Sequence, residues 1–135
     1  MEIIKRFGWV YYVGDASQLD SEKCGKWMCF FNDNKFIAKI CEDVVKMNIV
    51  NESKHSDEET GVACFYLNCD DIDAHKSIIS YFIENSLIRR TKSGRLYDIS
   101  FKLDNQTLAG EYGKNFHSET KLSKFIDLDT ECWLL

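Results

Sequence analysis

Gly61-Val-Ala-Cys-Phe-Tyr-Leu67 is the stretch of the sequence that decides the fold. It is short, contains β-branched and aromatic residues, and is apolar at successive positions. Such a run predicts a strand buried on both faces at the centre of a sheet. Apolar residues at helical spacing predict one helix before it and one after it. These residues are Phe36, Ile37, Ile40, Cys41, Val44 and Met47 in the first helix, and Ile72, His75, Ile78, Ile79, Phe82 and Ile83 in the second.

Four further strands are predicted from β-branched and aromatic content or from alternation of apolar and polar residues. They cover Trp9–Val13, Lys26–Phe31, Ile49–His55 at an edge of the sheet, and Tyr97–Leu103. Asn32-Asp33-Asn34 and Asp70-Asp71 precede the two helices and offer N-cap side chains. The order β-β-α-β-β-α-β predicts an α+β fold, with two helices packed on one face of a mostly antiparallel sheet.

The composition limits the class of protein. A chain of 135 residues with 44% hydrophobic content and no linker or internal repeat predicts one globular domain over residues 1–135. A net charge of −5 argues against general nucleic-acid binding, which needs a basic surface. No stretch approaches the roughly 20 apolar residues that span a bilayer, and Met1 is followed by Glu2 rather than by an apolar leader. We therefore expect a cytoplasmic protein that does not associate with membranes.

The six cysteines are expected to be reduced thiols. Cys24 and Cys29, like Cys64 and Cys69, are separated by four residues, a spacing that zinc sites also use. However, Cys29 and Cys64 fall within predicted strands, where a buried cysteine behaves as a small hydrophobic residue. The histidines show no metal-ligand spacing. The sequence therefore predicts no metal ion and no cofactor.

Lys102–Tyr112 combines a cation, a carboxylate, a hydroxyl, a glycine and a phenol directly after a predicted strand. This mixture suits a turn that closes over a polar, anionic ligand. Lys26 enters an otherwise apolar strand, where it either extends to water or contacts a ligand as a phosphate partner or a base. Tyr66 shares a strand face with Asn68 that becomes more polar toward the strand's end. Its hydroxyl either reaches solvent or belongs to a site.

Several short motifs, in order, resemble the Bles-type domain family. They are Trp9-Val-Tyr11, Gly25-Lys26-Trp27, Lys54-His55-Ser56, Cys64-Phe65-Tyr66, and the spaced set Lys102, Asp104, Thr107, Gly110 and Tyr112. The resemblance extends from about residue 9 to residue 125.

The resemblance implies a fold similar to that of the mRNA cap-binding translation initiation factor, with a curved sheet whose concave face holds a phosphorylated nucleotide. It also implies a distant relation to bacterial phosphothreonine lyases, which use a lysine as base and a histidine two residues later as acid. Lys26 stands at the position of the base, and Met28 stands where the acid is expected.

Three functions follow as alternatives. The first is a cytoplasmic binding domain for a phosphorylated small molecule or phospho-peptide. The second is a phosphothreonine-lyase-like enzyme with Lys26 as the catalytic base. The third is an acidic protein-interaction module of the inhibitor or immunity type. The predicted ligand-binding residues are Lys54, Tyr66, Lys102, Asp104, Thr107 and Tyr112. We expect at least three of Lys26, Lys54, Tyr66 and Lys102 to line one cleft beside the Asn105–Tyr112 turn.

Overall fold

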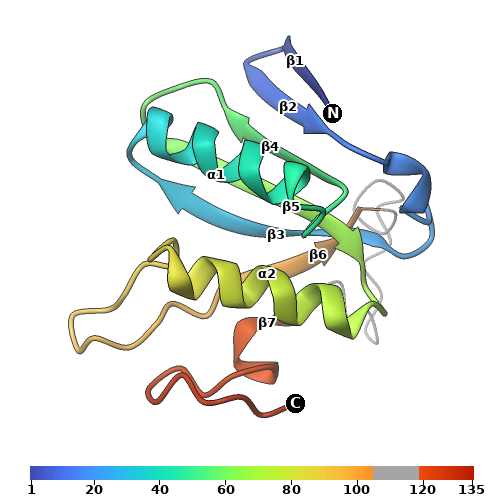
Figure 1. Cartoon of the computed structure of the whole chain (residues 1–135). Coiled ribbons are helices and arrows are strands. Elements are labelled where there is room, and N and C mark those ends of the chain that lie inside the picture. Colours follow the sequence, from blue (N-terminus) through green and yellow to red (C-terminus); the bar gives the residue numbers. More distant parts are fainter. Residues whose placement is uncertain (105–118) are drawn as a thin grey trace.

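A computed structural model describes residues 1–104 and 119–135 of the chain. These residues form one open sheet of seven strands, in the order β1-β2-β4-β5-β3-β6-β7, with every neighbouring pair antiparallel. The strands are β1 Glu2–Arg6, β2 Trp9–Val13, β3 Cys24–Phe31, β4 Glu52–Ser56, β5 Gly61–Asn68, β6 Ser100–Leu103 and β7 Glu119–Lys121. Two α-helices of the described residues, α1 Asn34–Lys46 and α2 Ile72–Glu84, lie on the same face of the sheet (Figure 1). The predicted α+β class is confirmed.

The apolar stripes of both helices explain why the helices pack on one face. The side chains that face the sheet are at most 4% exposed, and they are Ile37, Ile40, Val44, Ile78, Ile79 and Phe82. Phe36 and Met47, which the pattern placed in the first stripe, are exposed instead. The stripe of α1 is therefore narrower than its sequence suggests.

Each helix begins at the aspartate that the sequence indicates. Asp33 caps α1 by accepting a hydrogen bond from the Phe36 N–H at 3.2 Å. Asp71 caps α2 by accepting one from the Ala74 N–H at 3.1 Å. A carboxylate at this position satisfies a backbone donor that has no partner inside the helix.

The structure corrects two predicted strands. β4 begins at Glu52 and lies between β2 and β5, so it is not an edge strand. β6 begins at Ser100 rather than at Tyr97. The residues just before β6 bond outside the sheet, because the Asp98 carboxylate accepts hydrogen bonds from the N–H and the hydroxyl of Ser123, both at 2.8 Å.

Two strands, β1 and β7, are absent from the sequence prediction. β1 joins β2 through the two-residue turn Phe7-Gly8, in which both φ angles are positive, at 54° and 79°. Positive φ at both central residues is characteristic of type I′ hairpin turns. The glycine of this turn was the available signal for the hairpin.

His75 is buried in the core with both ring nitrogens hydrogen-bonded, as expected for a satisfied histidine on the helix stripe. It is 1% exposed. The Trp27 indole N–H donates to its Nδ1 at 3.0 Å, and its Nε2–H donates to the Cys69 carbonyl at 3.0 Å. Because an indole nitrogen can only donate, these contacts require a neutral ring with its proton on Nε2.

Acid should weaken the fold through His75. Burial lowers the pKa of this side chain, so the unfolded chain, with an ordinary pKa of about 6.5, binds more protons than the folded chain below that pH. The free energy of unfolding should therefore fall as the pH drops from about 7 to about 5.5. Urea titrations across this range, on the wild type and on His75→Phe, measure the effect. Equal pH slopes for the two proteins would exclude His75 as the cause.

Candidate functional site

The face of the sheet opposite α1 and α2, here the helix-free face, carries the predicted lysines. Side chains alternate along a strand, so Lys26 of β3 points away from the helices while Trp27 points into the core. Lys26 is directly opposite Tyr66 on β5 and opposite Lys102 on β6. The three residues thus form one row across three adjacent strands. The helix-free face also includes Trp9 and Tyr11 of β2, Glu52 and Lys54 of β4, Cys64 of β5 and Met28 of β3.

Lys54 joins this group from the neighbouring row. It pairs with Cys64 on one side and Tyr11 on the other. Its ammonium lies 4.2 Å from the centre of the Trp9 ring, 5.5 Å from that of Tyr11 and 6.0 Å from that of Tyr66. The Lys26 ammonium lies 5.8 Å from the same Tyr66 ring. Two cations from different strands therefore approach one tyrosine, and aromatic faces stabilise both of them.

Asp104, just after β6, forms an ion pair with Lys26. The side chains are 19% exposed for Lys26 and 28% for Asp104, so the pair is partly shielded from water. The carboxylate offsets one of the positive charges on this face and fixes the position of the Lys26 ammonium.

Burial decides the protonation of the neighbouring groups. It raises the pKa of Tyr66 far above the ordinary value, with further increases from Cys64 and Asp104. It also raises the pKa of the Cys64 thiol, against the opposing effect of Lys54 and Lys26. The pKa of Cys24 rises to about 11, through burial and then through Asp104. At neutral pH the phenol can therefore donate a hydrogen bond, and both thiols are protonated and poorly nucleophilic.

Glu52 is the acidic neighbour of this cluster on β4, directly opposite Tyr66. Burial raises the pKa of its carboxyl group, while Lys54 acts in the opposite direction. The sequence did not indicate a role for Glu52 or for the rings of Trp9 and Tyr11. Their alternation along β2 and β4 was visible in the sequence, but the pairing of these two strands, which are far apart along the chain, was not.

The structure therefore brings together Lys26, Lys54, Tyr66 and Lys102 on one face, with Asp104 in contact with Lys26. Thr107, Tyr112 and the turn that contains them lie outside the described residues. The cleft expected beside that turn stays a prediction for the same reason.

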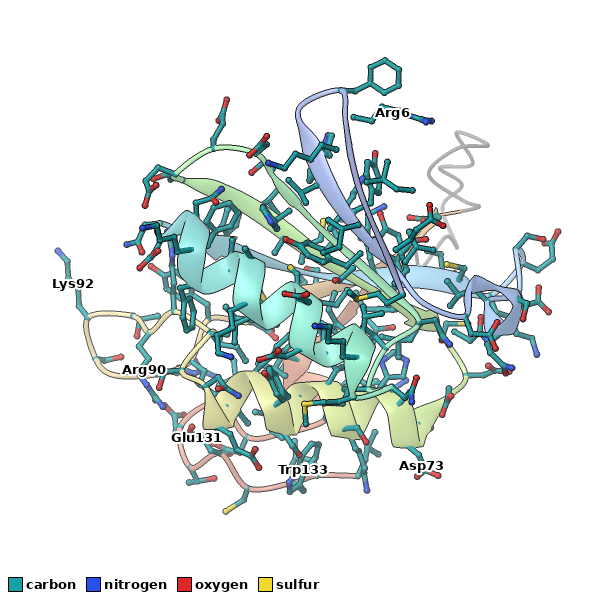
Figure 2. All side chains as sticks on the ribbon, turned by 45° about the horizontal axis from the view of Figure 1, so that its top comes forward. Arg6, Asp73, Arg90, Lys92, Glu131 and Trp133 are labelled. Carbon is teal, nitrogen blue, oxygen red and sulfur yellow. The ribbon has the colours of Figure 1, made fainter. Side chains whose placement is uncertain are left out.

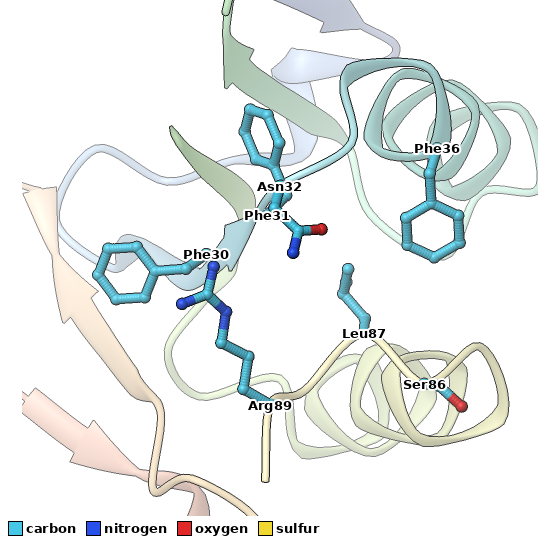
Figure 3. A pocket seen from close by; sticks show the side chains of 7 residues that line it. All are labelled: Phe30, Phe31, Asn32, Phe36, Ser86, Leu87 and Arg89. Carbon is cyan, nitrogen blue, oxygen red and sulfur yellow. The ribbon is translucent and has the colours of Figure 1, made fainter. Parts of the chain in front are cut away.

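A separate pocket of about 140 Å³ lies at the far end of β3, between the start of α1 and the segment that follows α2 (Figure 3). Two of its lining residues are in contact: the Arg89 guanidinium lies 5.7 Å from the centre of the Phe30 ring. The pocket is lined by Phe30, Phe31, Asn32, Phe36, Ser86, Leu87 and Arg89. None of the predicted site residues that the structure describes lines it.

The basic turn after α2 is partly held by the C-terminal segment. Arg90 forms an ion pair with Glu131 at 3.0 Å, and Arg95 approaches Asp129 at 3.7 Å. Lys92 extends from the tip of the loop into solvent (Figure 2). These charges lie apart from the helix-free face and do not contribute to the lysine cluster.

The cysteines do not combine into a site. Cys24 and Cys29 are five residues apart on β3, so their side chains point to opposite faces of the sheet. All six thiols are free. Within residues 1–104 and 119–135, no three His, Cys, Asp or Glu side chains are grouped so as to hold a metal ion. None of the helices in this part of the chain has the length and apolar character that crossing a membrane requires.

Comparisons of the chain with family models, with curated proteins and with solved structures give no match. The resemblance to the Bles-type family stays a prediction.

Proposed function

We propose that the protein is a binding domain for a phosphorylated ligand, either a nucleotide or a phosphorylated residue of a peptide. The ligand binds on the helix-free face. The observation that carries the proposal is the approach of the Lys26 and Lys54 ammonium groups to one ring, that of Tyr66, with Lys102 beside Lys26 in register.

The physical argument rests on charge. Three lysines on one face of the sheet, from β4, β3 and β6, repel one another by a few kcal/mol at an effective dielectric constant of about 20. Asp104 relieves part of this repulsion in the absence of ligand. A phosphate group relieves it further, because it accepts charge-assisted hydrogen bonds from several ammonium groups at once. The protonated Tyr66 hydroxyl supplies a neutral donor at the same place.

The geometry favours binding over a lyase reaction. Met28 lies on the helix-free face, two residues after Lys26, where the acid of a lyase is expected. His55 lies on the opposite face, where its Nε2 accepts from the Tyr12 hydroxyl at 3.1 Å and its Nδ1 donates to the Ser56 carbonyl at 2.9 Å. His75 is likewise bonded inside the core. Neither of these two histidines can serve a substrate on the helix-free face.

Lys54→Ala should weaken binding of a phosphorylated ligand by about tenfold or more, because a hydrogen bond to a charged group contributes about 1.5–3 kcal/mol. The probes are inorganic phosphate, AMP, GTP and O-phosphothreonine, in thermal-shift and calorimetric titrations. A ligand at 100 times its dissociation constant stabilises the wild type by roughly 2.7 kcal/mol.

Lys92→Ala is the matched control, since it removes the same charge from a solvent-exposed loop (Figure 2). Its affinity should equal that of the wild type. The proposal fails if no phosphorylated probe stabilises the wild type, or if the two variants bind equally well.

A further inference from the structure

β1 is an edge strand of the sheet that the described residues form. It pairs on one side with β2, and no other strand of the described residues pairs with it (Figure 1). Its side chains are largely exposed, including Ile3 at 51%. An edge of this kind presents unpaired backbone groups to which another strand can bond.

The hydrogen bonds around β2 show which backbone groups of β1 are free of the sheet. The Asp57 N–H donates to the Gly8 carbonyl at 2.8 Å, and the Gly14 N–H donates to the Asn51 carbonyl at 2.9 Å. Even-numbered residues of this segment therefore face β4, and the odd-numbered residues face β1. Those odd-numbered residues pair with the even-numbered residues of β1. Ile3 and Lys5 consequently direct their N–H and C=O groups away from the sheet.

The two ends of β1 carry opposite charges. The strand reads Glu2-Ile3-Ile4-Lys5-Arg6, with an acid at one end and bases at the other. Arg6 lies at the hairpin end of the strand (Figure 2). When such a strand pairs antiparallel with a copy of itself about Ile4, the acidic end of each strand meets the basic end of the other.

We propose that the protein forms a symmetric dimer in which β1 pairs antiparallel with β1 of a second copy. The two-fold axis passes beside Ile4, which faces the partner's Ile4. Glu2 faces the partner's Arg6, and Ile3 faces the partner's Lys5. Isologous interfaces of this kind are the commonest in homo-oligomers, and strand addition at a free edge is a recurring mode of recognition.

The backbone directions agree with this register. Ile3 and Lys5 have the outward-facing groups, so they form the hydrogen-bonded pairs with the partner's Lys5 and Ile3. Glu2, Ile4 and Arg6 then form the non-hydrogen-bonded pairs, in which opposite side chains are closest. Parallel pairing would place like charges side by side, and centring the pair on Lys5 would oppose two lysines. The antiparallel arrangement about Ile4 avoids both.

The dimer would join the two sheets edge to edge and place both helix-free faces on the same side. Opposite residues of paired strands project from the same face of a sheet, so Glu2 and Ile4 of both copies lie on that side. The contact involves one short strand from each copy, so the dimer is weak and depends on protein concentration. It does not depend on the proposed ligand.

A charge-swap experiment tests the pairing. Sedimentation equilibrium from about 20 μM to about 1 mM should detect the dimer of the wild type. Glu2→Arg or Arg6→Glu alone should weaken it about tenfold or more, because each change places like charges together at two symmetric positions. The double variant Glu2→Arg/Arg6→Glu should regain the wild-type affinity. A wild type that is monomeric at about 1 mM, or a double variant as weak as the single ones, overturns the proposal.

A proline pair tests the same interface through the backbone. Ile3→Pro removes an N–H that faces the partner, and should abolish the dimer without changing the melting temperature of the monomer by much. Ile4→Pro removes an N–H that faces β2, and should instead lower the melting temperature. Hydrogen exchange at Ile3 and Lys5 should slow as the protein concentration rises. A dimer that persists in Ile3→Pro, or exchange at these amides that is independent of concentration, overturns the proposal.

Discussion

Gly25→Ala should lower the free energy of unfolding by about 3 kcal/mol, as overpacking of a filled core does. Gly25 lies on the helix side of β3, opposite Leu103 of β6. A Cβ at this position would stand 2.5 Å from the Lys102 carbonyl oxygen and 2.6 Å from Cζ of Phe101. The Phe101 ring thus occupies the space that a side chain of Gly25 would need. Since one of the close atoms belongs to the backbone, β6 itself must move to accept a methyl group.

Urea denaturation of four proteins measures this effect: the wild type, Gly25→Ala, Phe101→Leu and the double variant. The shorter leucine relieves part of the contact, so the double variant should be more stable than the sum of the two single changes predicts, by about 1 kcal/mol. Strict additivity would show that the Phe101 ring does not restrict position 25. A loss below about 0.5 kcal/mol in Gly25→Ala would contradict the tight packing between β3 and β6.

Gly25-Lys26-Trp27 shows how far a motif can be interpreted from sequence. Only Lys26 lies on the helix-free face. Gly25 accommodates the Phe101 ring, and Trp27 is fully buried and bonded to His75. Two of the three residues are therefore explained by packing. Alternation along the predicted strand separates Lys26 from Trp27, but Gly25 lay outside that strand and the sequence could not identify Phe101 as its neighbour.

The class of fold was predictable because local patterns determine it. The helix stripes, the aspartate caps and the apolar strand β5 all depend on residues close together in the sequence. The order of the strands depends on pairings between distant segments, such as β2 with β4 and β3 with β6. No local pattern specifies those pairings, and the position of β4 was accordingly mistaken for an edge.

The candidate site shows the same limit. Lys26, Lys54 and Lys102 were identified by their chemical type, and the register places them on one face. The aromatic surroundings of Lys54 arise because β2 and β4 are neighbours, which the sequence does not reveal. Asp104 was predicted as a ligand-binding residue, but its ion pair with Lys26 depends on the pairing of β3 with β6, which the sequence does not reveal.

His75→Ala should have the largest effect on stability, a loss of about 4 kcal/mol in the free energy of unfolding. The imidazole packs between aromatic rings, with its centre 4.8 Å from that of Phe101 and 5.2 Å from that of Phe125. Its removal leaves a cavity, and it also deprives the Trp27 N–H and the Cys69 carbonyl of their partner. An unsatisfied buried polar group alone costs about 1–3 kcal/mol.

His75→Phe separates the two contributions, because it fills the cavity but cannot accept the indole hydrogen. It should lower the free energy of unfolding by about 2 kcal/mol, because the Trp27 N–H is left without an acceptor. The further change Trp27→Phe removes that N–H, so the penalty for the unsatisfied donor should disappear in the double variant. Urea denaturation of the single and double variants measures this coupling, and a coupling near zero would show that the Trp27–His75 bond contributes nothing.

His75 lies on the helix side of the sheet, so the folded His75→Phe protein should bind phosphorylated ligands as the wild type does. A loss of stability with unchanged affinity would then separate the residues that hold the sheet together from the lysines proposed to bind the ligand.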